Sequence, residues 1–353
     1  MDTLYALVLA GGRGTRFWPL SRKERPKQCV SLNGADAYLS QTVERLSRFI
    51  PKERILIVTG KPMEAAVRSV LNGIPDDNIL VEPWGRNTAP CIGWGAVEIG
   101  KRCVGAVMAV FPCDHRIGKP DLLESVVLSA AQAVAATNAF VTIGIQPDRA
   151  ETGFGYLAVG PEAGTWGGHA CHTVEHFMEK PAPDIAQQFL ESGRHLWNAG
   201  MFVFSVDALR DAFRTHLPRS ATALENIAHD PSQLVTEWGN LDATSIDYGI
   251  MERTRHILTI PCDLDWSDMG SWSTISEDLP KIPGGHGTAR TVVSHQSTGC
   301  VVHAPDKVVA LLGLENVVIV DTEDALLVMH ADRAQQVGKI VRLLEDSDEK
   351  GIT

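Results

Sequence analysis

The sequence lacks several features, and each absence excludes a class of protein. It contains no run of about 18 apolar residues, so we expect no membrane span. The chain opens Met1-Asp2-Thr3, without the basic stretch and cleavage site of an export signal. Its seven cysteines are scattered and include no Cys-x-x-Cys pair, so neither a disulfide framework nor a zinc site is expected. Together these absences indicate a cytoplasmic protein with reduced thiols.

Basic residues are in the minority. The 353 residues include 32 Lys and Arg against 43 Asp and Glu, which gives a formal net charge of −11. Neither a nucleic acid nor a membrane is therefore expected as a partner. Residues 13–27 reverse this balance, with six basic residues against the single acidic residue Glu24. So local a cluster suggests a binding site for a small polyanion, although a solvated basic loop would have the same composition.

Short apolar runs alternate with segments of helical periodicity in the first 145 residues, which predicts an α/β fold. The predicted strands cover residues 4–10, 55–59, 79–81, 106–111 and 140–145. The predicted helices cover residues 41–49, 64–71, 89–102 and 122–137. The strands lack polar alternation, as expected for a doubly wound sheet with helices on both faces. Ligands of such sheets bind beyond the carboxyl ends of the strands.

The pattern becomes less regular after residue 156. Further strands are predicted at 171–178 and 200–206, and helices at 206–215 and 220–229. The stretch 280–288, with two prolines and three glycines, is the best candidate for a linker. It is followed by four predicted strands (299–303, 307–312, 317–321 and 325–329) and a closing helix (331–344). We therefore expect a catalytic domain over residues 1–283 and a small β-rich domain with a terminal helix over residues 284–353.

The first predicted strand leads directly into a glycine-rich loop, GGRGTR, at residues 11–16. Glycines in this place let the backbone approach a phosphate and point its amides at the anion. A dinucleotide-binding fingerprint would need glycine where Phe17 stands, and a P-loop would end in Gly-Lys-Ser or Gly-Lys-Thr, which is absent. Arginines alternate with the glycines instead. The loop therefore suits a triphosphate, whose charge requires cationic side chains as well as amides.

The string LAGGRGTRFWPLSRKERPK, residues 9–27, resembles the signature of the sugar-nucleotide pyrophosphorylases, and among them the bacterial mannose-1-phosphate guanylyltransferases. Seven further segments follow in the order of that family: EPWGRNTAPCIG, FPCDH, ETGFGYL, FMEKP, WNAGMFVF, SIDYGIMER and WSDMGSW. The first corresponds to EPxGRNTAPAI in the family, and Phe154 stands where many relatives have tyrosine. The tail from residue 313 is also similar, so the resemblance covers essentially the whole chain.

This resemblance implies a Rossmann-like mixed sheet of the nucleotide-diphospho-sugar transferase type, with the small C-terminal β-rich domain closed by a helix. It implies the reaction GTP + α-D-mannose 1-phosphate = GDP-mannose + diphosphate, with Mg²⁺ or another divalent cation such as Mn²⁺ as cofactor. It also implies a homodimer. Longer relatives continue into a metal-binding cupin domain, so this chain, which stops at Thr353, is expected to be monofunctional.

The resemblance also assigns roles to individual residues. Arg16 and Lys27 would be catalytic, because they would neutralise the α-phosphate and the departing diphosphate. The nucleotide would be bound by Ala10, Gly11, Gly12, Gly14, Thr15, Glu82, Asn87 and Thr88. The sugar phosphate would be bound by Gly155, Glu179, Lys180, Asn198 and Asp247. The candidate metal ligands are Asp114 and Asp268, since Mg²⁺ prefers hard oxygen ligands; only the fold could bring these two aspartates together.

Glu82 is the candidate reader of the base. A carboxylate can accept hydrogen bonds from both N1–H and the 2-amino group of guanine, whereas uracil and thymine would repel its second oxygen. A solvated carboxylate at the end of a strand is the alternative. Two other functions stay open: a nucleotidyltransferase for another sugar 1-phosphate, and a non-catalytic sugar-nucleotide-binding subunit. The latter would be expected to have lost Lys27, Asp114 or Asp268, and all three are present.

Overall fold

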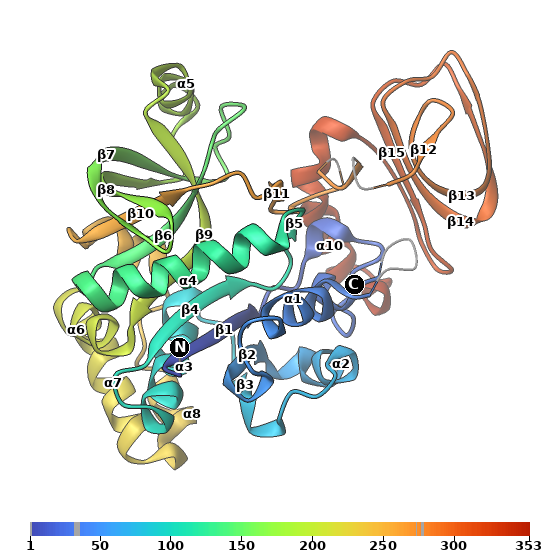
Figure 1. Cartoon of the computed structure of the whole chain (residues 1–353). Coiled ribbons are helices and arrows are strands. Elements are labelled where there is room, and N and C mark those ends of the chain that lie inside the picture. Colours follow the sequence, from blue (N-terminus) through green and yellow to red (C-terminus); the bar gives the residue numbers. More distant parts are fainter. Residues whose placement is uncertain (1, 32–35, 273, 277–278) are drawn as a thin grey trace.

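The computed structural model describes residues 2–31, 36–272, 274–276 and 279–353. Within these residues, one large mixed sheet contains nine strands (Figure 1). Their spatial order is β3 (Ile79–Glu82), β2 (Ile55–Gly60), β1 (Leu4–Ala10), β4 (Val107–Pro112), β9 (His195–Ser205), β6 (Phe140–Ile145), β10 (Ile257–Pro261), β8 (His169–Glu179) and β7 (Gly155–Trp166). The α/β fold class predicted from the sequence is confirmed.

The neighbours β3, β2, β1 and β4 run parallel, as the sequence predicted. Strand β9 then lies antiparallel between β4 and β6, so these two strands are not paired with each other. Local apolar runs carry no signal for such an insertion, since its partners are distant in sequence. The carboxyl ends of the four parallel strands meet at one edge of the sheet, where a ligand of a doubly wound fold is expected to bind.

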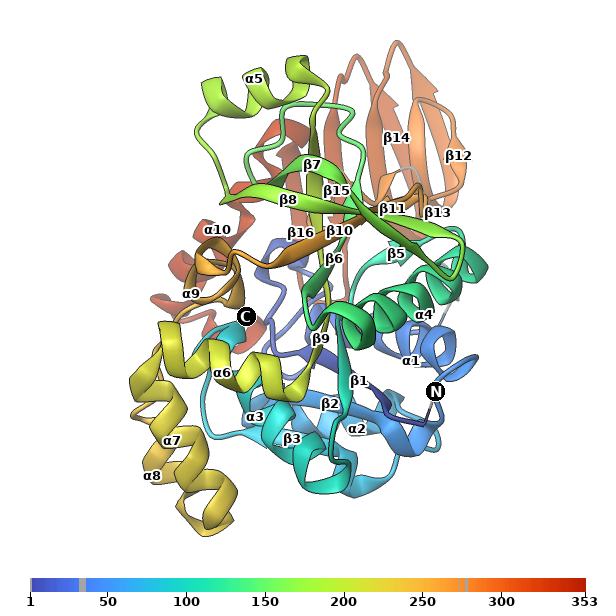
Figure 2. The same cartoon turned by 60° about the vertical axis from the view of Figure 1, so that its left-hand side comes forward.

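Helices cover both faces of the main sheet (Figure 2). One face carries α1 (Tyr38–Ser47), α2 (Glu64–Val70) and α4 (Pro120–Thr137), and the other carries α3 (Thr88–Arg102), α6 (Val206–His216) and α7 (Pro218–His229). In β1, Ala6 and Val8 face the first layer and Leu7 faces the second, which explains its unbroken apolar run. The shorter helices are α5 (Pro183–Ser192), α8 (Leu234–Trp238) and α9 (Ile246–Gly249). No helix in the described ranges is both long and apolar enough to cross a membrane.

A second sheet lies in the C-terminal part, in the order β12 (Lys281–Ile282), β13 (Gly285–His295), β14 (Cys300–Leu312), β15 (Val317–Asp321) and β16 (Leu326–His330). Strands β13, β14 and β15 are parallel to one another. The chain then forms a 3₁₀ helix, Ala331–Gln336, and α10 (Val337–Glu345), which returns to the N-terminal part. Phe17, Trp18, Trp272, Val337 and Val341 share one apolar core, so the two parts of the chain are packed together.

Three local predictions for the C-terminal part are wrong. Most of the predicted linker at 280–288 lies in β12 and β13, and its glycines serve strand pairing: a Cβ on Gly285 would lie 1.9 Å from the carbonyl oxygen of Cys300. The strands predicted at 299–303 and 307–312 form the single strand β14. The predicted helix at 331–344 begins with six residues of 3₁₀ helix and becomes α-helical only at Val337.

Candidate active site

The glycine-rich loop leaves β1 at the carboxyl edge of the sheet. Gly14 has a φ of 63°, and a Cβ added to it would lie 2.3 Å from the Cβ of Lys27. Only glycine combines this left-handed conformation with so close an approach. The carbonyl oxygen of Gly14 accepts a hydrogen bond from Ser21 Oγ over 2.7 Å. The packing of Gly14 therefore determines where the Lys27 side chain begins.

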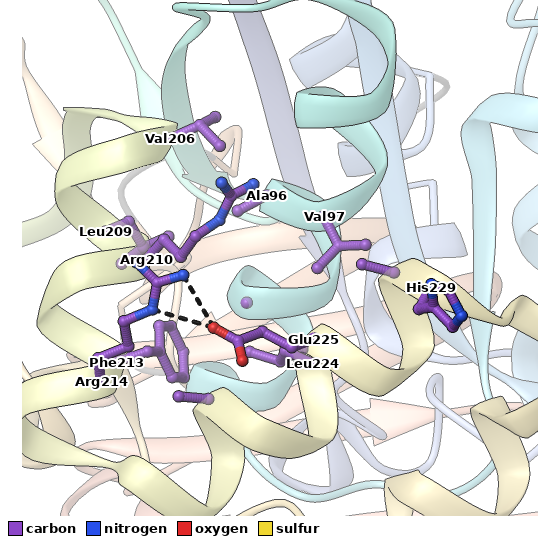
Figure 3. Close-up of a pocket in the computed structure, with 13 residues that line it drawn as sticks. Ala96, Val97, Val206, Leu209, Arg210, Phe213, Arg214, Leu224, Glu225 and His229 are labelled. Carbon is purple, nitrogen blue, oxygen red and sulfur yellow. Dashed lines mark hydrogen bonds and ion pairs between the residues drawn. The ribbon is translucent and has the colours of Figure 1, made fainter.

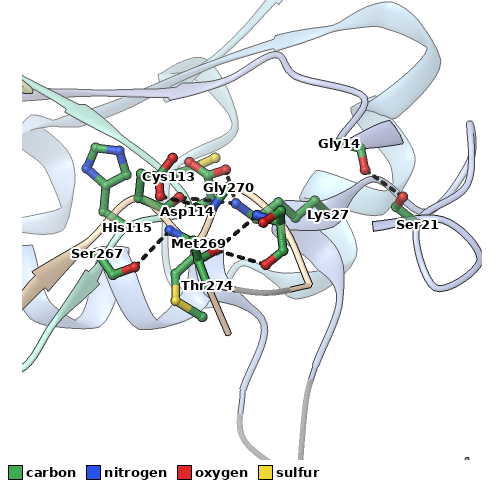
Figure 4. Close-up of polar contacts among 12 residues, drawn as sticks. Gly14, Ser21, Lys27, Cys113, Asp114, His115, Ser267, Met269, Gly270 and Thr274 are labelled. Carbon is green, nitrogen blue, oxygen red and sulfur yellow. Dashed lines mark hydrogen bonds and ion pairs between the residues drawn. The ribbon is translucent and has the colours of Figure 1, made fainter. Parts of the chain in front are cut away.

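Lys27 is a buried cation at the centre of a polar cluster (Figure 4). It begins the short 3₁₀ helix Lys27–Cys29 and is only 4% exposed. Its Nζ donates to Asp114 Oδ2 over 2.6 Å and to the carbonyl oxygen of Asp268 over 3.4 Å. Nζ also lies 4.8 Å from the centre of the Phe17 ring, a favourable cation–π distance. The structure thus brings the predicted catalytic lysine and both predicted metal ligands to one point.

The two aspartates differ in their electrostatic surroundings. Burial, the largest single influence, raises the pKa of Asp114, but the charges of Lys27 and His115 and the hydrogen bond from Lys27 together hold this pKa below its usual value. Burial raises the pKa of Asp268, and the charge of Asp114 adds to the effect. Asp268 follows β11 (Trp266–Ser267), whose pairing with β5 (Arg116–Ile117) holds it near Asp114.

This donor set fits a divalent cation. One lysine balances only one of the two carboxylates, so the cluster keeps a net negative charge. Among the described residues, no group of three or more His, Cys, Asp or Glu side chains is placed to hold a metal ion. Mg²⁺ needs only one or two carboxylates where water and substrate phosphates supply the other ligands.

A cavity of about 350 Å³ lies between the glycine-rich loop and the start of α3. Five of the predicted nucleotide-binding residues line it: Gly11, Gly12, Glu82, Asn87 and Thr88. Glu82 ends β3 and is only 3% exposed, so the alternative of a solvated carboxylate is wrong. Burial raises its pKa, although a hydrogen bond from Cys91 opposes this effect. Glu82 thus presents a carboxylate in a cavity whose other walls are largely apolar.

Hydrogen bonds of three predicted residues, Ala10, Asn87 and Thr88, hold the loop and the cavity in place. The carbonyl oxygen of Ala10 accepts hydrogen bonds from Gln28 Nε2 over 2.9 Å and from Thr59 Oγ1 over 3.0 Å. Asn87 caps α3, since its side chain accepts from Thr88 N over 2.9 Å. Gln28 and Thr59 were not among the residues predicted for the site. The only feature of the sequence that could have indicated their role is a polar residue inside or at the end of an apolar segment, as with Thr59 in ILIVT at residues 55–59.

The outer side of the loop contacts the C-terminal segment. Arg13 Nη2 lies 2.6 Å from Glu345 Oε1, and a Cβ on Gly338 would lie 3.2 Å from Thr15 Oγ1. Arg16, predicted to be catalytic, is exposed on the same turn, and its side chain has no hydrogen bond or ion pair with the other described residues. The structure therefore places Thr15 and Arg16 at the loop without joining them to the Lys27 cluster.

The predicted sugar-phosphate residues gather on β7, β8, β9 and α9. Gly155 is paired with Glu179, and a Cβ on it would lie 2.5 Å from Glu179 Oε2. Lys180 Nζ donates to Glu179 Oε1 over 2.8 Å. Asn198 Nδ2 donates to Asp247 Oδ1 over 3.1 Å. The structure brings these five residues into one continuous cluster.

This second cluster is strongly polar and partly buried. Burial, together with the negative charge of Glu179, raises the pKa of Asp247 to about 7. Asn198 Oδ1 accepts from Thr142 Oγ1 over 2.9 Å, which fixes the orientation of the amide. The cavity that contains Glu82 is joined to this cluster, because Thr88 Oγ1 accepts from the amide of Ile246, next to Asp247, over 2.9 Å. Thr142, which is fully buried within β6, was not among the residues predicted for the site.

Another cavity, of about 380 Å³, lies between α3, α6 and α7 (Figure 3). Leu209, Phe213 and Leu224 line it, and Arg214 Nη2 lies 2.9 Å from Glu225 Oε1 beside them. The lining contains none of the residues predicted for the site. Its walls are mainly apolar, and Arg214, one of the cations that line it, is already paired with Glu225. The candidate active site is therefore the edge that joins Lys27, Glu82 and Asp247.

Comparisons with known proteins identify the family of the chain. The family model described as Nucleotidyl transferase matches residues 5–283, and a MannoseP isomerase/GMP-like beta-helix domain matches residues 290–344. Alginate biosynthesis protein AlgA of Pseudomonas aeruginosa is 35% identical over 96% of this chain and 72% of its own length. Mannose-1-phosphate guanylyltransferase of Escherichia coli is 35% identical over 98% of this chain and 74% of its own.

A solved structure gives the same result. The crystal structure described as mannose-1-phosphate geranyltransferase from Thermus thermophilus superposes with a TM-score of 0.88 at 34% identity. The superposition covers 97% of this chain and 99% of the other. Both the sequence relatives and this structure match the catalytic and the C-terminal parts together. The chain therefore belongs to the nucleotidyl transferase family, in the group of the mannose-1-phosphate guanylyltransferases.

Proposed function

We propose that this protein is a GTP-dependent mannose-1-phosphate guanylyltransferase, which converts GTP and α-D-mannose 1-phosphate to GDP-mannose and diphosphate. The observation that carries the proposal is the buried Lys27 between Asp114 and Asp268, beside a cavity that contains Glu82. The names of the relatives support the choice of substrates, since two at 35% identity are mannose-1-phosphate guanylyltransferases.

The proposed reaction brings two anions together, so the protein must mainly position them and neutralise their charge. An oxygen of the sugar 1-phosphate attacks the α-phosphorus of GTP, and diphosphate leaves. Lys27 Nζ would donate to the α-phosphate, where burial of the side chain strengthens the attraction. Arg16, exposed on the loop, would meet the departing diphosphate. The amides of Gly11 and Gly12 would approach the phosphates without side chains in the way.

Asp114 and Asp268 would hold the divalent cation, Mg²⁺ or Mn²⁺. Their carboxylates are hard oxygen donors, and Lys27 balances only one of the two charges. When bound, the cation would supply further neutralisation of the charge on the reacting phosphates. Lys27 would remain necessary for catalysis, because its Nζ donates a hydrogen bond to the reacting phosphate in addition to the charge of the cation.

The cavity that contains Glu82 would recognise the base, and the cluster around Asp247 would recognise the sugar phosphate. Glu82 would accept from N1–H and the 2-amino group of guanine. Asn198 and Asp247 are suited to vicinal hydroxyls, since an amide and a carboxylate offer both donors and acceptors. Lys180, which is exposed beside Glu179, would meet the phosphate of the sugar as a point charge.

Three further properties belong to this proposal. The protein would be cytoplasmic, which its seven unpaired cysteines support. Residues 1–283 would form the catalytic domain and residues 284–353 the small β-rich domain, a division supported by the two family matches, to residues 5–283 and 290–344. The protein would be a homodimer, an expectation that rests on the resemblance to the family.

The test measures release of diphosphate in the presence of Mg²⁺. GTP, ATP, UTP and dTTP are each combined with mannose, glucose and fucose 1-phosphate. Release with GTP and mannose 1-phosphate alone supports the proposal. Release with another sugar 1-phosphate would support the proposed reaction type but contradict mannose 1-phosphate as the substrate. Absence of release in every combination, with GTP still bound, would favour the non-catalytic subunit.

A lysine variant tests the mechanism in the same assay. Lys27→Met keeps the length of the side chain and removes its charge, so kcat is expected to fall by about 10²–10³-fold. Lys101 lies on the surface of α3, 2.9 Å from Glu98, and provides the matched control Lys101→Met. Equal activity of the two variants would contradict the assignment of Lys27.

A further inference from the structure

Cys91 lies in the wall of the nucleotide cavity, in the first turn of α3. It stands where the family segment EPxGRNTAPAI has alanine. Its Sγ is 3.2 Å from Glu82 Oε2 and also 3.2 Å from the carbonyl oxygen of Asn87. A thiol has a single proton, so it donates to one of these acceptors at a time.

The carboxylate is the stronger of the two acceptors. Hydrogen bonds to an ionised group are roughly twice as strong as those between neutral groups. Cys91 is 8% exposed and Glu82 is 3% exposed, so water competes little for either group. Burial and the charge of Glu82 raise the pKa of Cys91 well above its usual value, so the sulfur keeps the proton that it donates.

The rest of the Glu82 carboxylate remains open toward the loop. The Cβ positions of Gly11 and Gly60 lie 3.3 Å and 3.6 Å from Oε1, so two glycines leave space around this oxygen. A carboxylate can accept about four hydrogen bonds, and the thiol uses one of them. In the described part of the chain, Cys91 is the only residue whose side chain donates to Glu82.

We propose that Cys91 is a positioning residue for guanine recognition: its thiol fixes one oxygen of the Glu82 carboxylate and so sets how the remaining lone pairs face the base. This inference rests on the proposed function, in which Glu82 reads guanine. Alanine at this position would leave the buried carboxylate without a side-chain donor. Cys91 therefore sharpens the discrimination of the base and takes no part in the transfer of the nucleotidyl group.

The test compares GTP with ITP, which lacks the 2-amino group. In Cys91→Ala and Cys91→Val, the ratio of kcat/KM for GTP to that for ITP is expected to fall by about five- to ten-fold, as for loss of a weak donor to a charged acceptor. Cys91→Ser keeps a donor and should restore most of the ratio. Cys300→Ala, which removes another buried thiol from β14, is the matched control.

The pH dependence separates positioning from a merely structural role. The hydrogen bond from Cys91 lowers the pKa of Glu82. Without this bond the carboxylate should protonate at a higher pH, so Cys91→Ala should lose its preference for GTP earlier than the wild type as the pH falls. A structural defect would lower the rates with GTP and ITP together.

The outcomes distinguish the inference from the function on which it rests. An unchanged GTP:ITP ratio in folded Cys91→Ala and Cys91→Val would overturn the role of Cys91. If Glu82→Gln lost the preference in the same assay, the proposed function would stand. A wild-type protein that turned over GTP no better than ITP would overturn the reading of the 2-amino group by Glu82, and with it the role of Cys91, while transfer from GTP to mannose 1-phosphate would still support the proposed function. Alanine and valine bracket the volume of the thiol, so a packing failure in one variant leaves the other to give the answer.

Discussion

Replacing Gly14 with alanine tests whether the glycine-rich loop determines the position of Lys27. The added Cβ would stand 2.3 Å from the Cβ of Lys27 and 3.1 Å from its backbone nitrogen. Carbon atoms in contact are about 3.5–4.0 Å apart, so Lys27 must shift by about 1 Å or more. A shift of about 1 Å in a catalytic group can lower the rate by about 10²-fold. We therefore expect kcat of Gly14→Ala to fall by about that factor.

The same substitution should also lower the free energy of unfolding. Alanine in a left-handed conformation costs about 1–2 kcal/mol, and the overpacking against Lys27 adds about 1–3 kcal/mol. Gly193 separates the two effects. It has a φ of 62° at the end of α5, and a Cβ on it would meet nothing within 4 Å. Gly193→Ala should therefore show the conformational cost alone and keep the wild-type kcat.

The assay is release of diphosphate from GTP and mannose 1-phosphate, with chemical denaturation as the measure of stability. Gly14→Ala must be compared with Gly193→Ala at a temperature where both are folded. The reasoning would be refuted if kcat of the two variants agreed to within about threefold, because a displaced Lys27 should cost far more than that.

Three other outcomes are expected. Asp268→Asn should raise the Mg²⁺ concentration for half-maximal activity by about tenfold or more, since it removes one of the two proposed carboxylate ligands; an unchanged metal titration would exclude this role. Burial and Glu179 raise the pKa of Asp247 to about 7 in the folded protein, above its ordinary 3.8. The wild type should therefore lose stability as the pH rises from about 4 to 7, and Asp247→Asn should raise Tm more at pH 8 than at pH 5. Gly338→Leu should press on Thr15 and raise KM for GTP several-fold while KM for mannose 1-phosphate stays constant; equal changes in both would contradict it.

Local sequence accounts for the parallel half of the fold. The predicted strands at 4–10 and 140–145 have the observed bounds, because each is an apolar run with polar or turn-forming residues on both sides. The place of β9 between β4 and β6 could not be predicted in this way. Its pairing depends on strands at residues 107–112 and 140–145, and an apolar pattern does not specify a distant partner.

The site could be predicted only in part. The glycine-rich loop and the basic residues around it indicate a phosphate-binding function, and the family resemblance adds Asp114 and Asp268. Their meeting at Lys27 is a property of the fold, since no spacing in the sequence implies it. Gln28 and Thr142 were missed because a buried polar residue reveals its role only when its tertiary partner is known.

The contacts between the glycine-rich loop and the C-terminal segment can form only after nearly the whole chain has been synthesised. Arg13 pairs with a residue 332 positions later, and Trp18 Nε1 donates to a carbonyl oxygen 334 positions later. A ribosome that adds 5–20 residues per second needs roughly 17–66 s to span this interval. During that time the rings of Phe17 and Trp18 lack their apolar partners on α10. The emerging chain can thus pair its central strands well before α10 packs against the glycine-rich loop, and until then the two aromatic rings lack part of their apolar cover.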